Sequence, residues 1–458
     1  MEVASNIYKA YDIRGIYGSE LTEEVTYKTA RAYAQLLKKE NAGKLLTVAV
    51  GEDMRLSSPS LKDQVIAGLT DEGLHVMHVG IVSTPAFYYA VAKYAYDGGI
   101  MVTASHNPKE FNGLKFVRAG VKPVSMENGI AEIRDTVIAD NFAAPTAGGN
   151  VEEQSGIVEE HTKFEVDWVG TEGIRPFKIV ADCANAMGST YVRAMFSHLP
   201  CELIEMNFEL DGNMPAHEAD PFKEENNQDL MKRVVEEGAD LGIATDGDGD
   251  RIFFIDNEGN MIEPAIIRGL VAKLVLEREP NSTICYDIRP GRITRDMIEA
   301  AGGKPSVTKV GHSFIKDQAI KEGAAFAGES SGHFFMRTEL GVFETPVIVA
   351  MMLLKFFSRK EESVADQVRP YRKYAHSGEI NSAVKDKEGI MNKLLEIYEA
   401  DAKSISKLDG ITVEYEDYWF NVRPSNTESV LRLNLESINE ETMRAKTDEI
   451  LAIIRKDS

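Results

Sequence analysis

The 458-residue sequence has few cysteines, no long apolar run and no secretory signal, and each shortage excludes a class of protein. Cys183, Cys201 and Cys285 are odd in number and show no C-x-x-C spacing, so the sequence predicts neither a disulfide framework nor a zinc site. The longest apolar run, residues 347–354, is far shorter than the ~20 residues of a membrane-spanning helix. The first residues lack the basic and apolar regions of a signal peptide. We therefore expect a cytoplasmic protein with reduced cysteines.

Positive charge is also scarce, because 51 Lys and Arg residues face 73 Asp and Glu residues. The formal net charge of −22 disfavours nucleic acids and anionic membranes as partners, since both would repel such a chain. A small anionic substrate is not excluded, but a local cluster of Arg and Lys would have to bind it. The composition is otherwise typical of a globular enzyme of three or four domains, and it leaves monomer and homodimer both open.

One pattern of three apolar strands recurs three times along the chain. In each repeat the first strand ends on an acid, which is Asp53, Asp182 or Asp287. Helix-like segments separate the strands, and this alternation predicts α/β layers with a largely parallel sheet. The three repeats occupy residues 45–55, 75–85 and 98–108, then 177–188, 201–212 and 239–250, then 282–292, 304–314 and 323–333.

The third strand of every repeat runs into a polar loop rich in glycine or serine. These loops read "TASHNP" (103–108), "TDGDGDR" (245–251) and "GESSGH" (328–333). Ligands of open α/β sheets bind at the carboxyl ends of strands, so we expect the three loops to converge on one cleft between domains. The alternative is that each loop is only a tight turn, but three loops in matching positions favour a site.

The last part of the chain has a different pattern. A helix-like segment and two strand-like runs follow residue 368, and Leu431, Leu433 and Leu435 alternate with polar residues as in a half-buried strand. The segment 141–156 has the composition of an interdomain linker. We therefore predict three similar mixed-sheet α/β domains plus a smaller α+β domain. The predicted bounds are 1–148, 149–254, 255–367 and 368–458.

Three aspartates, Asp246, Asp248 and Asp250, lie within five positions of the second loop. The spacing also begins an EF-hand loop, but Arg251 and Asn257 stand where that loop needs glycine and glutamate, which excludes a calcium sensor. A compact set of carboxylates suits a hard cation such as Mg²⁺, which often shares its ligands with a phosphate. The alternative is a solvated acidic turn.

Ser105 in the first loop is the candidate nucleophile. A loop serine is usually a turn or cap residue, and His106 beside it points elsewhere in an extended chain, so a triad is not indicated. A phosphoserine fits better, because it carries about −1.5 to −2 charges and three acceptor oxygens that a metal on the aspartates could hold.

Four motifs, "TASHNPKEFNGLK", "DGDGDR", "GESSGH" and "RPSNTES", resemble those of the α-D-phosphohexomutase superfamily. The resemblance begins at "YKAYDIRG" and covers nearly the whole chain. It implies four domains around a central cleft, the first three with one α/β topology. It also implies that the protein interconverts hexose 1-phosphates and 6-phosphates by means of a phosphoserine and Mg²⁺. Small hexose phosphates would then be its partners, with a hexose 1,6-bisphosphate as activator.

The resemblance also implies roles for individual residues. Ser105 would carry the phosphate and, with the three aspartates, hold the metal. Arg14, Lys115 and Arg251 would surround the transferring group, while His333 would be an acid or base. The residues implied to bind the sugar or the phosphate that does not react are Tyr11, Arg289, His312, Glu329, Ser331, Arg423, Ser425, Asn426 and Thr427.

Some roles stay open at this point. A desolvated Lys115 near other cations would have its pKa depressed toward neutrality, so either Lys115 or His333 could take the proton of the attacking hydroxyl. His106 either positions the serine loop or is a packed structural residue. "RPSNTE" suits a phosphate clamp, and its alternative is a helix capping box from Ser425 to Glu428.

We call "GESSGH" the sugar loop and "RPSNTE" the phosphate loop. Both loops look most like those of the phosphomannomutase/phosphoglucomutase group, which accepts mannose and glucose. A phosphoglucosamine mutase is the alternative within the superfamily. Outside it, a sugar-phosphate phosphatase would lose the same phosphoserine to water, and a divalent-metal or sugar-phosphate binding protein would need no nucleophile at all.

Overall fold

The computed structural model describes residues 4–146, 148–289, 291–425 and 430–456. The chain divides into two compact units. The first consists of residues 1–262 and 331–365, and the second of residues 263–330 and 366–458.

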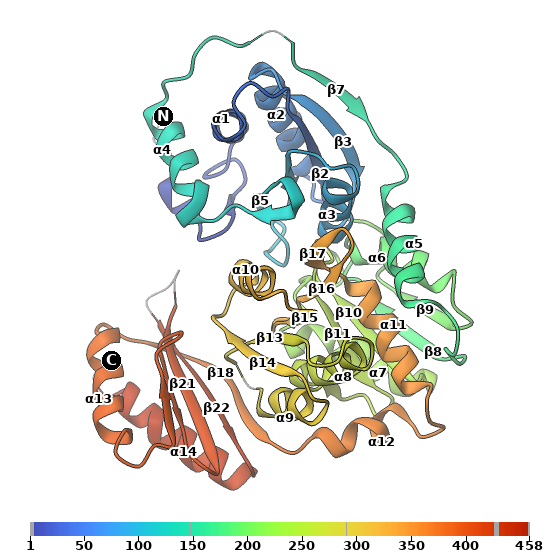
Figure 1. Ribbon diagram of the computed structural model, residues 1–458, viewed down its shortest axis with the longest axis vertical. Coiled ribbons are helices and arrows are strands. Elements are labelled where there is room, and N and C mark those ends of the chain that lie inside the picture. The colour runs from blue at the N-terminus through green and yellow to red at the C-terminus, as the bar shows by residue number, and fades with distance from the viewer. Residues whose placement is uncertain (1–3, 147, 290, 426–429, 457–458) are drawn as a thin grey trace. The chain divides into compact units, whose positions relative to one another are not determined.

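The first sheet belongs to the first unit and has the strand order β1-β5-β4-β2-β3-β7, with β6 paired to β5 (Figure 1). The central strand β2 is parallel to both β3 and β4, whereas β5 is antiparallel to β4 and β1. The strands are β1 (Ile13–Ile16), β2 (Thr47–Glu52), β3 (His75–Ile81), β4 (Gly98–Val102), β5 (Phe111–Arg118), β6 (Lys122–Pro123) and β7 (Asn150–Glu153).

Both faces of this sheet are covered, because successive side chains of a strand point to opposite faces. Val48 and Val50 of β2 belong to the apolar core under α1, α2 and α4. Ala49, which lies between them, packs in a separate core with α3. The buried strands therefore read as continuous apolar runs. The helices are α1 (Glu23–Glu40), α2 (Ser58–Asp71), α3 (Thr84–Lys93) and α4 (Ala131–Ala139).

The second sheet, also in the first unit, has the order β12-β11-β10-β8-β9. Strand β8 lies between β10 and β9 and is parallel to both, and β11 is antiparallel to β10. The strands are β8 (Lys178–Asp182), β9 (Glu202–Met206), β10 (Leu241–Thr245), β11 (Ile252–Asp256) and β12 (Met261–Ile262), and the helices are α5 (Ile157–Val169), α6 (Gly188–Phe196) and α7 (Gln228–Glu237). The hairpin β16 (Phe334–Thr338) and β17 (Gly341–Glu344) and helix α11 (Pro346–Phe357) complete this unit.

In the second unit, β13 (Thr283–Asp287) lies between β14 (Lys304–Thr308) and β15 (Phe326–Gly328), and all three strands are parallel. This repeats the arrangement of β2 and of β8 with their neighbours. Helices α8 (Pro264–Arg278), α9 (Arg292–Ala300) and α10 (His312–Glu322) pack around these strands.

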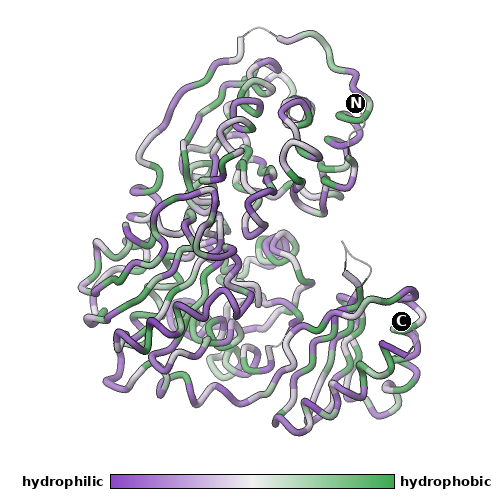
Figure 2. The backbone as a smooth tube through the Cα atoms, turned by 180° about the vertical axis from the view of Figure 1, so that it is seen from behind, coloured by the Kyte–Doolittle hydropathy of each residue, from purple (hydrophilic) through white to green (hydrophobic). Residues whose placement is uncertain are grey.

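The C-terminal sheet is antiparallel throughout, in the order β18-β22-β21-β20-β19. Helices α13 (Lys387–Tyr398) and α14 (Glu440–Ile454) pack against each other and against this sheet (Figure 1). Hydrophobic and hydrophilic residues alternate along its strands (Figure 2). The prediction of a half-buried strand around Leu433 is wrong for the second half of β22, because Asn434 and Glu436 are as buried as the leucines. The strands are β18 (Ala375–Ala383), β19 (Ser404–Ser406), β20 (Ile411–Glu414), β21 (Tyr418–Pro424) and β22 (Val430–Ser437), and the short helix α12 (Val364–Val368) precedes them.

The predicted fold class of three mixed α/β sheets plus an antiparallel C-terminal sheet is confirmed. The third strands β4, β10 and β15 all end where the polar loops begin. Within the segment interpreted as a linker, β7 adds a parallel strand to β3. No helix among the described residues is long and apolar enough to cross a membrane.

Candidate active site

The loop between β10 and β11 holds Asp246, Asp248 and Asp250, whose side chains converge. One carboxylate oxygen from each lies within 4.8 Å of the others, and all three residues are at most 2% exposed. Glycines allow this crowding, since Gly249 has a φ of 73° that L side chains rarely adopt. Asp248 is further held by the N-terminus of α3, where Thr84 donates its N–H to the Asp248 carbonyl oxygen at 2.9 Å and its hydroxyl to Oδ2 at 2.6 Å.

Ser105 lies directly on this cluster. Its Oγ donates to Asp246 Oδ2 at 2.7 Å, and the residue is only 1% exposed. The backbone has a φ of 50°, which is uncommon for a residue with a side chain, and Thr103 Oγ1 accepts the Ser105 N–H at 2.9 Å. The serine hydroxyl also lies 3.3 Å from His106 Nδ1. Burial lowers the pKa of His106 well below its usual range, and this favours a neutral ring that accepts a hydrogen bond.

Three cations surround the cluster, one from β5, one from the aspartate loop itself and one from β1. Lys115 of β5 donates Nζ to Asp248 Oδ2 and to Asp250 Oδ2, both at 2.6 Å. Arg251 donates its N–H to Asp246 Oδ1 at 3.1 Å, and its Nε lies 3.7 Å from Asp246 Oδ2. Arg14 of β1 reaches the serine loop, where it donates to the Ala104 carbonyl oxygen at 3.3 Å and to Asn107 Oδ1 at 2.6 Å.

His333 belongs to the same site, since its Nε2 lies 3.1 Å from Asp250 Oδ1. Its Nδ1 lies 3.0 Å from the hydroxyl of Ser331. A single β-bridge between Arg251 and His333 aligns the two backbones. Tyr11, the remaining predicted residue of the N-terminal motif, is half-buried.

The electrostatics of the site follow from crowding charges away from water. Burial, together with the neighbouring Asp250 and Asp248, raises the pKa of Asp246 to about 8. Burial would also raise the pKa of Asp250, but Lys115 and His333 hold it well below its usual range. The expectation of a depressed Lys115 pKa is wrong for this arrangement. Burial lowers that pKa, but Asp248 and Asp250 raise it well above the usual value.

The cluster fits a divalent cation. Its donors are all carboxylate oxygens, and within the described part of the chain the buried Oδ1 of Asp248 has no hydrogen-bond partner. Three carboxylates at such short separations repel one another, and a bound cation would relieve this repulsion.

In the second unit, Arg289, His312 and Glu329 lie around the carboxyl ends of β13, β14 and β15. Glu329 is 2% exposed and accepts from Arg289 at 3.2 Å and from the N–H of Gly311, which precedes His312, at 2.8 Å. Arg289 Nε in turn donates to Asp287 Oδ2 at 2.5 Å. The structure therefore brings Arg289 and Glu329 of separate motifs together, and His312 begins α10 directly after the Gly311 that binds Glu329.

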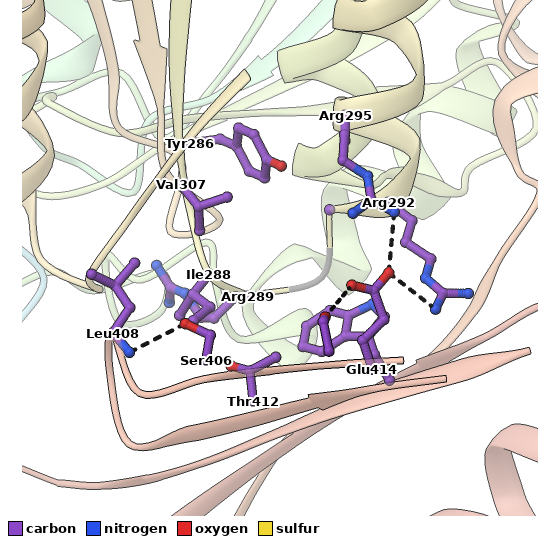
Figure 3. A pocket seen from close by; sticks show the side chains of 13 residues that line it. Tyr286, Ile288, Arg289, Arg292, Arg295, Val307, Ser406, Leu408, Thr412 and Glu414 are labelled. Atoms are coloured by element: carbon purple, nitrogen blue, oxygen red, sulfur yellow. Dashed lines mark hydrogen bonds and ion pairs between the residues drawn. The ribbon is translucent and has the colours of Figure 1, made fainter. Parts of the chain in front are cut away.

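Arg289 also lines a cavity of about 190 Å³ with Arg292 and Arg295 (Figure 3). The last two arginines point toward Glu414 of β20, at 3.5 and 3.3 Å. Arg292 also donates to the carbonyl oxygens of Tyr415, Glu416 and Tyr418. These arginines therefore hold the C-terminal sheet against α9 within the second unit.

The phosphate loop joins β21 to β22. Arg423 and Arg432 lie directly opposite each other on these strands, and both bind Glu379 of β18. Like charges on facing strands repel, and the Glu379 carboxylate between the two arginines offsets this repulsion. Ser425 is 7% exposed and lies 3.4 Å from a terminal nitrogen of Arg432. Because β22 follows the loop, the capping-box alternative does not hold. The predicted residues Asn426 and Thr427 lie outside the described residues.

Four family models match the chain in order. They are phosphoglucomutase/phosphomannomutase alpha/beta/alpha domain I at residues 5–143, domain II at 158–259, domain III at 263–374 and the C-terminal domain at 379–453. Together they span nearly the whole sequence. The chain belongs to the phosphoglucomutase/phosphomannomutase family. It is therefore an enzyme, a phosphohexomutase.

Individual proteins agree with this assignment. The enzyme is 36% identical over 457 residues to a phosphomannomutase of Vibrio cholerae, with 98% of both chains covered. A crystal structure of a phosphoglucomutase/phosphomannomutase family protein from Burkholderia thailandensis matches with a TM-score of 0.89, 29% identity and 98% coverage of both chains. An N-acetylphosphoglucosamine mutase of Aspergillus fumigatus, solved with GlcNAc-6P and magnesium, shares the fold at 12% identity, with a TM-score of 0.66 and coverage of 100% of this chain and 96% of that one.

The sequence interpretation missed three residues that contact the predicted ones. Thr84 gave no signal, because a threonine before a proline indicates only a helix start. Arg432 follows the phosphate motif and could have been found as a charge beside it. Arg55 is fully buried against the serine loop, and its "DMR" repeats the Asp-x-Arg spacing of "DIR" at 12–14 and 287–289.

Proposed function

We propose that this enzyme interconverts the 1-phosphate and 6-phosphate of mannose, of glucose or of both through a phosphoserine at Ser105. The observation that carries the proposal is the 2.7 Å hydrogen bond from Ser105 Oγ to Asp246, within a buried group of three carboxylates. A serine that served only to form a turn would not need to lie against three buried carboxylates. The name of the Vibrio relative supports mannose as a substrate.

Mg²⁺ is the cation that we propose for the cluster, held by Asp246, Asp248, Asp250 and the oxygen on Ser105. When bound, it would neutralise charge on the transferring phosphoryl group. The magnesium in the Aspergillus mutase supports this choice.

The remaining residues position the reactants and handle charge and protons. Arg14 and Lys115 lie where they can face the equatorial phosphoryl oxygens, since both contact the serine loop or the carboxylates. The oxygen of the free sugar hydroxyl bonds to phosphorus while the bond from phosphorus to Ser105 Oγ breaks. The proton of that hydroxyl passes to His333, whose Nε2 lies 3.1 Å from Asp250 Oδ1, because Asp248 and Asp250 raise the pKa of Lys115 and keep its ammonium protonated.

Both ends of the sugar must react at one serine, so we propose that a hexose 1,6-bisphosphate forms and turns over before the second transfer. Such a step needs a second phosphate clamp, and Arg423, Ser425 and Arg432 offer one. The sugar hydroxyls would be bound by Glu329, Ser331, Arg289 and His312, with Tyr11 as a further contact. Asn426 and Thr427 would join the clamp. Free bisphosphate would act as an activator that restores phosphate on Ser105.

The same proposal includes four domains at residues 1–148, 149–254, 255–367 and 368–458, and a cytoplasmic setting. The three cysteines are free, as expected of a reducing compartment.

The test is an assay of the purified enzyme with mannose 1-phosphate, glucose 1-phosphate and glucosamine 1-phosphate, in Mg²⁺ and a trace of bisphosphate. We expect the 6-phosphates of mannose and glucose. Inorganic phosphate as the main product would identify a phosphatase, and turnover of glucosamine 1-phosphate alone would identify a phosphoglucosamine mutase. The matched variant Ser105→Ala should fold, lack the added phosphate in an intact-mass spectrum and lose turnover.

A further inference from the structure

The spacing Asp-x-Arg occurs three times in the sequence, at residues 12–14, 53–55 and 287–289. In all three places the arginine Nε donates to Oδ2 of the aspartate two positions earlier, at 2.8, 3.1 and 2.5 Å. The terminal guanidinium nitrogens of each arginine then donate to a loop of the candidate active site. Arg14 and Arg55 bond to the serine loop, and Arg289 bonds to Glu329 of the sugar loop.

Arg55 makes the largest set of these contacts. Its terminal nitrogens donate to four carbonyl oxygens of the serine loop and the strand after it, at distances of 2.7 to 2.9 Å, and the residue is 1% exposed. Asp53 holds Arg55 from the other side and accepts the Ser58 hydroxyl at 2.6 Å. The four acceptors are the carbonyl oxygens of Ser105, Asn107, Pro108 and Phe111.

One of these carbonyls belongs to Ser105 itself. Arg55 donates to it at 2.7 Å, and a Cβ added to Gly247 would meet the same oxygen at 2.3 Å. The Ser105 carbonyl therefore lies between a fixed guanidinium and the backbone of the aspartate loop. With φ at 50°, the backbone of Ser105 is held by its surroundings and not by its own preference.

We propose that Arg55, fixed by Asp53, is the positioning residue of the phosphoryl-carrying serine loop. This rests on the proposed role of Ser105 as the phosphoryl carrier. Arg55 sets the direction of Ser105 Oγ through the backbone and touches no substrate. The equivalent pair of Asp287 and Arg289 holds the Glu329 side chain, in addition to the sugar contact proposed for Arg289 itself, so the two pairs act on different loops. One aligns the phosphoryl donor, and the other aligns the sugar contact.

The position of the serine loop decides whether the phosphoryl group reaches the sugar or water. In transfer, a sugar oxygen bonds to phosphorus and the bond from phosphorus to Ser105 Oγ breaks. In a loosened loop, a water oxygen takes the place of the sugar oxygen. The same phosphorus–Oγ bond breaks, one water proton ends on Oγ, and inorganic phosphate leaves. A displacement that needs in-line geometry loses rate steeply when its donor is misplaced.

The experiment compares Arg55→Lys with the wild type and with Arg31→Lys. Lysine keeps the charge but cannot reach four carbonyls. Arg31 is a matched control, since it is 6% exposed, binds Glu72 and the Ala143 carbonyl oxygen, and belongs to α1, which covers the same sheet. The readouts are kcat and KM with mannose 1-phosphate, the phosphorylated fraction by intact mass, and the rate at which the ³²P-labelled enzyme loses phosphate to water.

For Arg55→Lys we expect kcat to fall about 10- to 100-fold, KM to stay within about threefold, and loss of label to water to speed up. Arg31→Lys should change none of these beyond about threefold. An Arg55→Lys variant with the kcat and label retention of Arg31→Lys overturns the inference.

If Arg55→Lys does not fold, Asp53→Asn serves instead, because it keeps the shape and releases Arg55 from its charge partner. The same pattern of lowered kcat and faster label loss is expected, and a wild-type pattern overturns the inference. Ser105→Ala separates this failure from a failure of the proposed function. Persistent turnover in Ser105→Ala refutes the phosphoserine, whereas a dead Ser105→Ala beside a normal Arg55→Lys refutes only the positioning role.

Discussion

The backbone of Gly247 leaves no room for a side chain, since a Cβ there would meet the Ser105 carbonyl oxygen at 2.3 Å. We predict that Gly247→Ala pushes the serine loop off the aspartates and costs about 1–3 kcal/mol of unfolding free energy. The kcat of the folded variant should also fall, because the serine loop is displaced in molecules that remain folded. Gly43→Ala is the control, because Gly43 has a φ of 80° with open space around it. It should lower the Tm modestly and leave kcat unchanged. Equal kcat in both variants would contradict the close contact.

Arg423 is a second residue whose loss has a specific signature. If Arg423 binds the phosphate that does not react, Arg423→Ala should weaken the binding of the 1-phosphate, the 6-phosphate and the bisphosphate to a similar extent. Losing a charge-assisted contact costs about 1.5–3 kcal/mol, or roughly 10- to 150-fold in affinity. Binding measured by calorimetry checks this.

The control for that experiment is Arg444→Ala, since Arg444 is an exposed residue of α14 paired with Glu440. It should bind all three ligands normally. An Arg423→Ala variant that weakens only one isomer would place Arg423 at the reacting end of the sugar.

At the scale of elements, the edge strand β7 pairs with β3 through its backbone, and a histidine adds a side-chain contact between the two strands. His78 Nδ1 of β3 lies 2.7 Å from Glu153 Oε2 of β7, and its Nε2 lies 3.5 Å from Glu52 Oε1 of β2. The positive charge of Lys62 in α2 acts against protonation of the ring. The nearby Glu52 carboxylate raises the pKa of His78 above 6.5, and Glu153 adds to this effect, although burial and Lys62 lower the pKa. The protonated ring therefore stabilises the fold below about pH 6.5, and this contribution is lost as the pH rises through the raised pKa.

We predict that the Tm of the wild type exceeds that of His78→Gln by more at about pH 6 than at about pH 8.5. Thermal unfolding at both pH values measures the difference. His198→Gln is the control, because His198 forms no described ion pair. A larger difference at the higher pH would contradict a stabilising charged His78.

Elements were easier to predict from the sequence than their pairing. Strands β2, β8 and β13 were predicted because buried parallel strands read as apolar runs ending on an acid. Strand β7 was interpreted as part of a linker, because its sequence carries no apolar pattern. The structure gives the reason, since all four of its residues are exposed. The site behaved in the same way. Local motifs predicted Ser105 and the aspartates, but Thr84 and Lys115 meet Asp248 only through the fold. The wrong pKa direction for Lys115 arose because its carboxylate partners lie 133 and 135 positions away in sequence.

At the scale of the whole molecule, the account requires a metal for chemistry more than for folding. Excess chelator should stop turnover and Mg²⁺ should restore it, while the far-UV circular dichroism stays unchanged. Mg²⁺ should also raise the Tm of the wild type, because a ligand that binds only the folded state stabilises it.

Asp248→Asn should lose both the activity and the Mg²⁺-dependent rise in Tm. Asp63→Asn removes the same charge from a side chain that is 66% exposed, and it should keep both. Full activity in excess chelator, or recovery with Zn²⁺ alone, would contradict a site built from hard oxygen ligands.

The central claim is that one phosphoryl group passes from Ser105 to the sugar. It is tested most directly by a single-turnover experiment. Enzyme labelled with ³²P on Ser105 is mixed with unlabelled mannose 1-phosphate and quenched at short times. The account predicts that label leaves the protein, appears first in mannose 1,6-bisphosphate and then in mannose 6-phosphate. Label that stays on the protein while product forms, or that leaves only as inorganic phosphate, would contradict it.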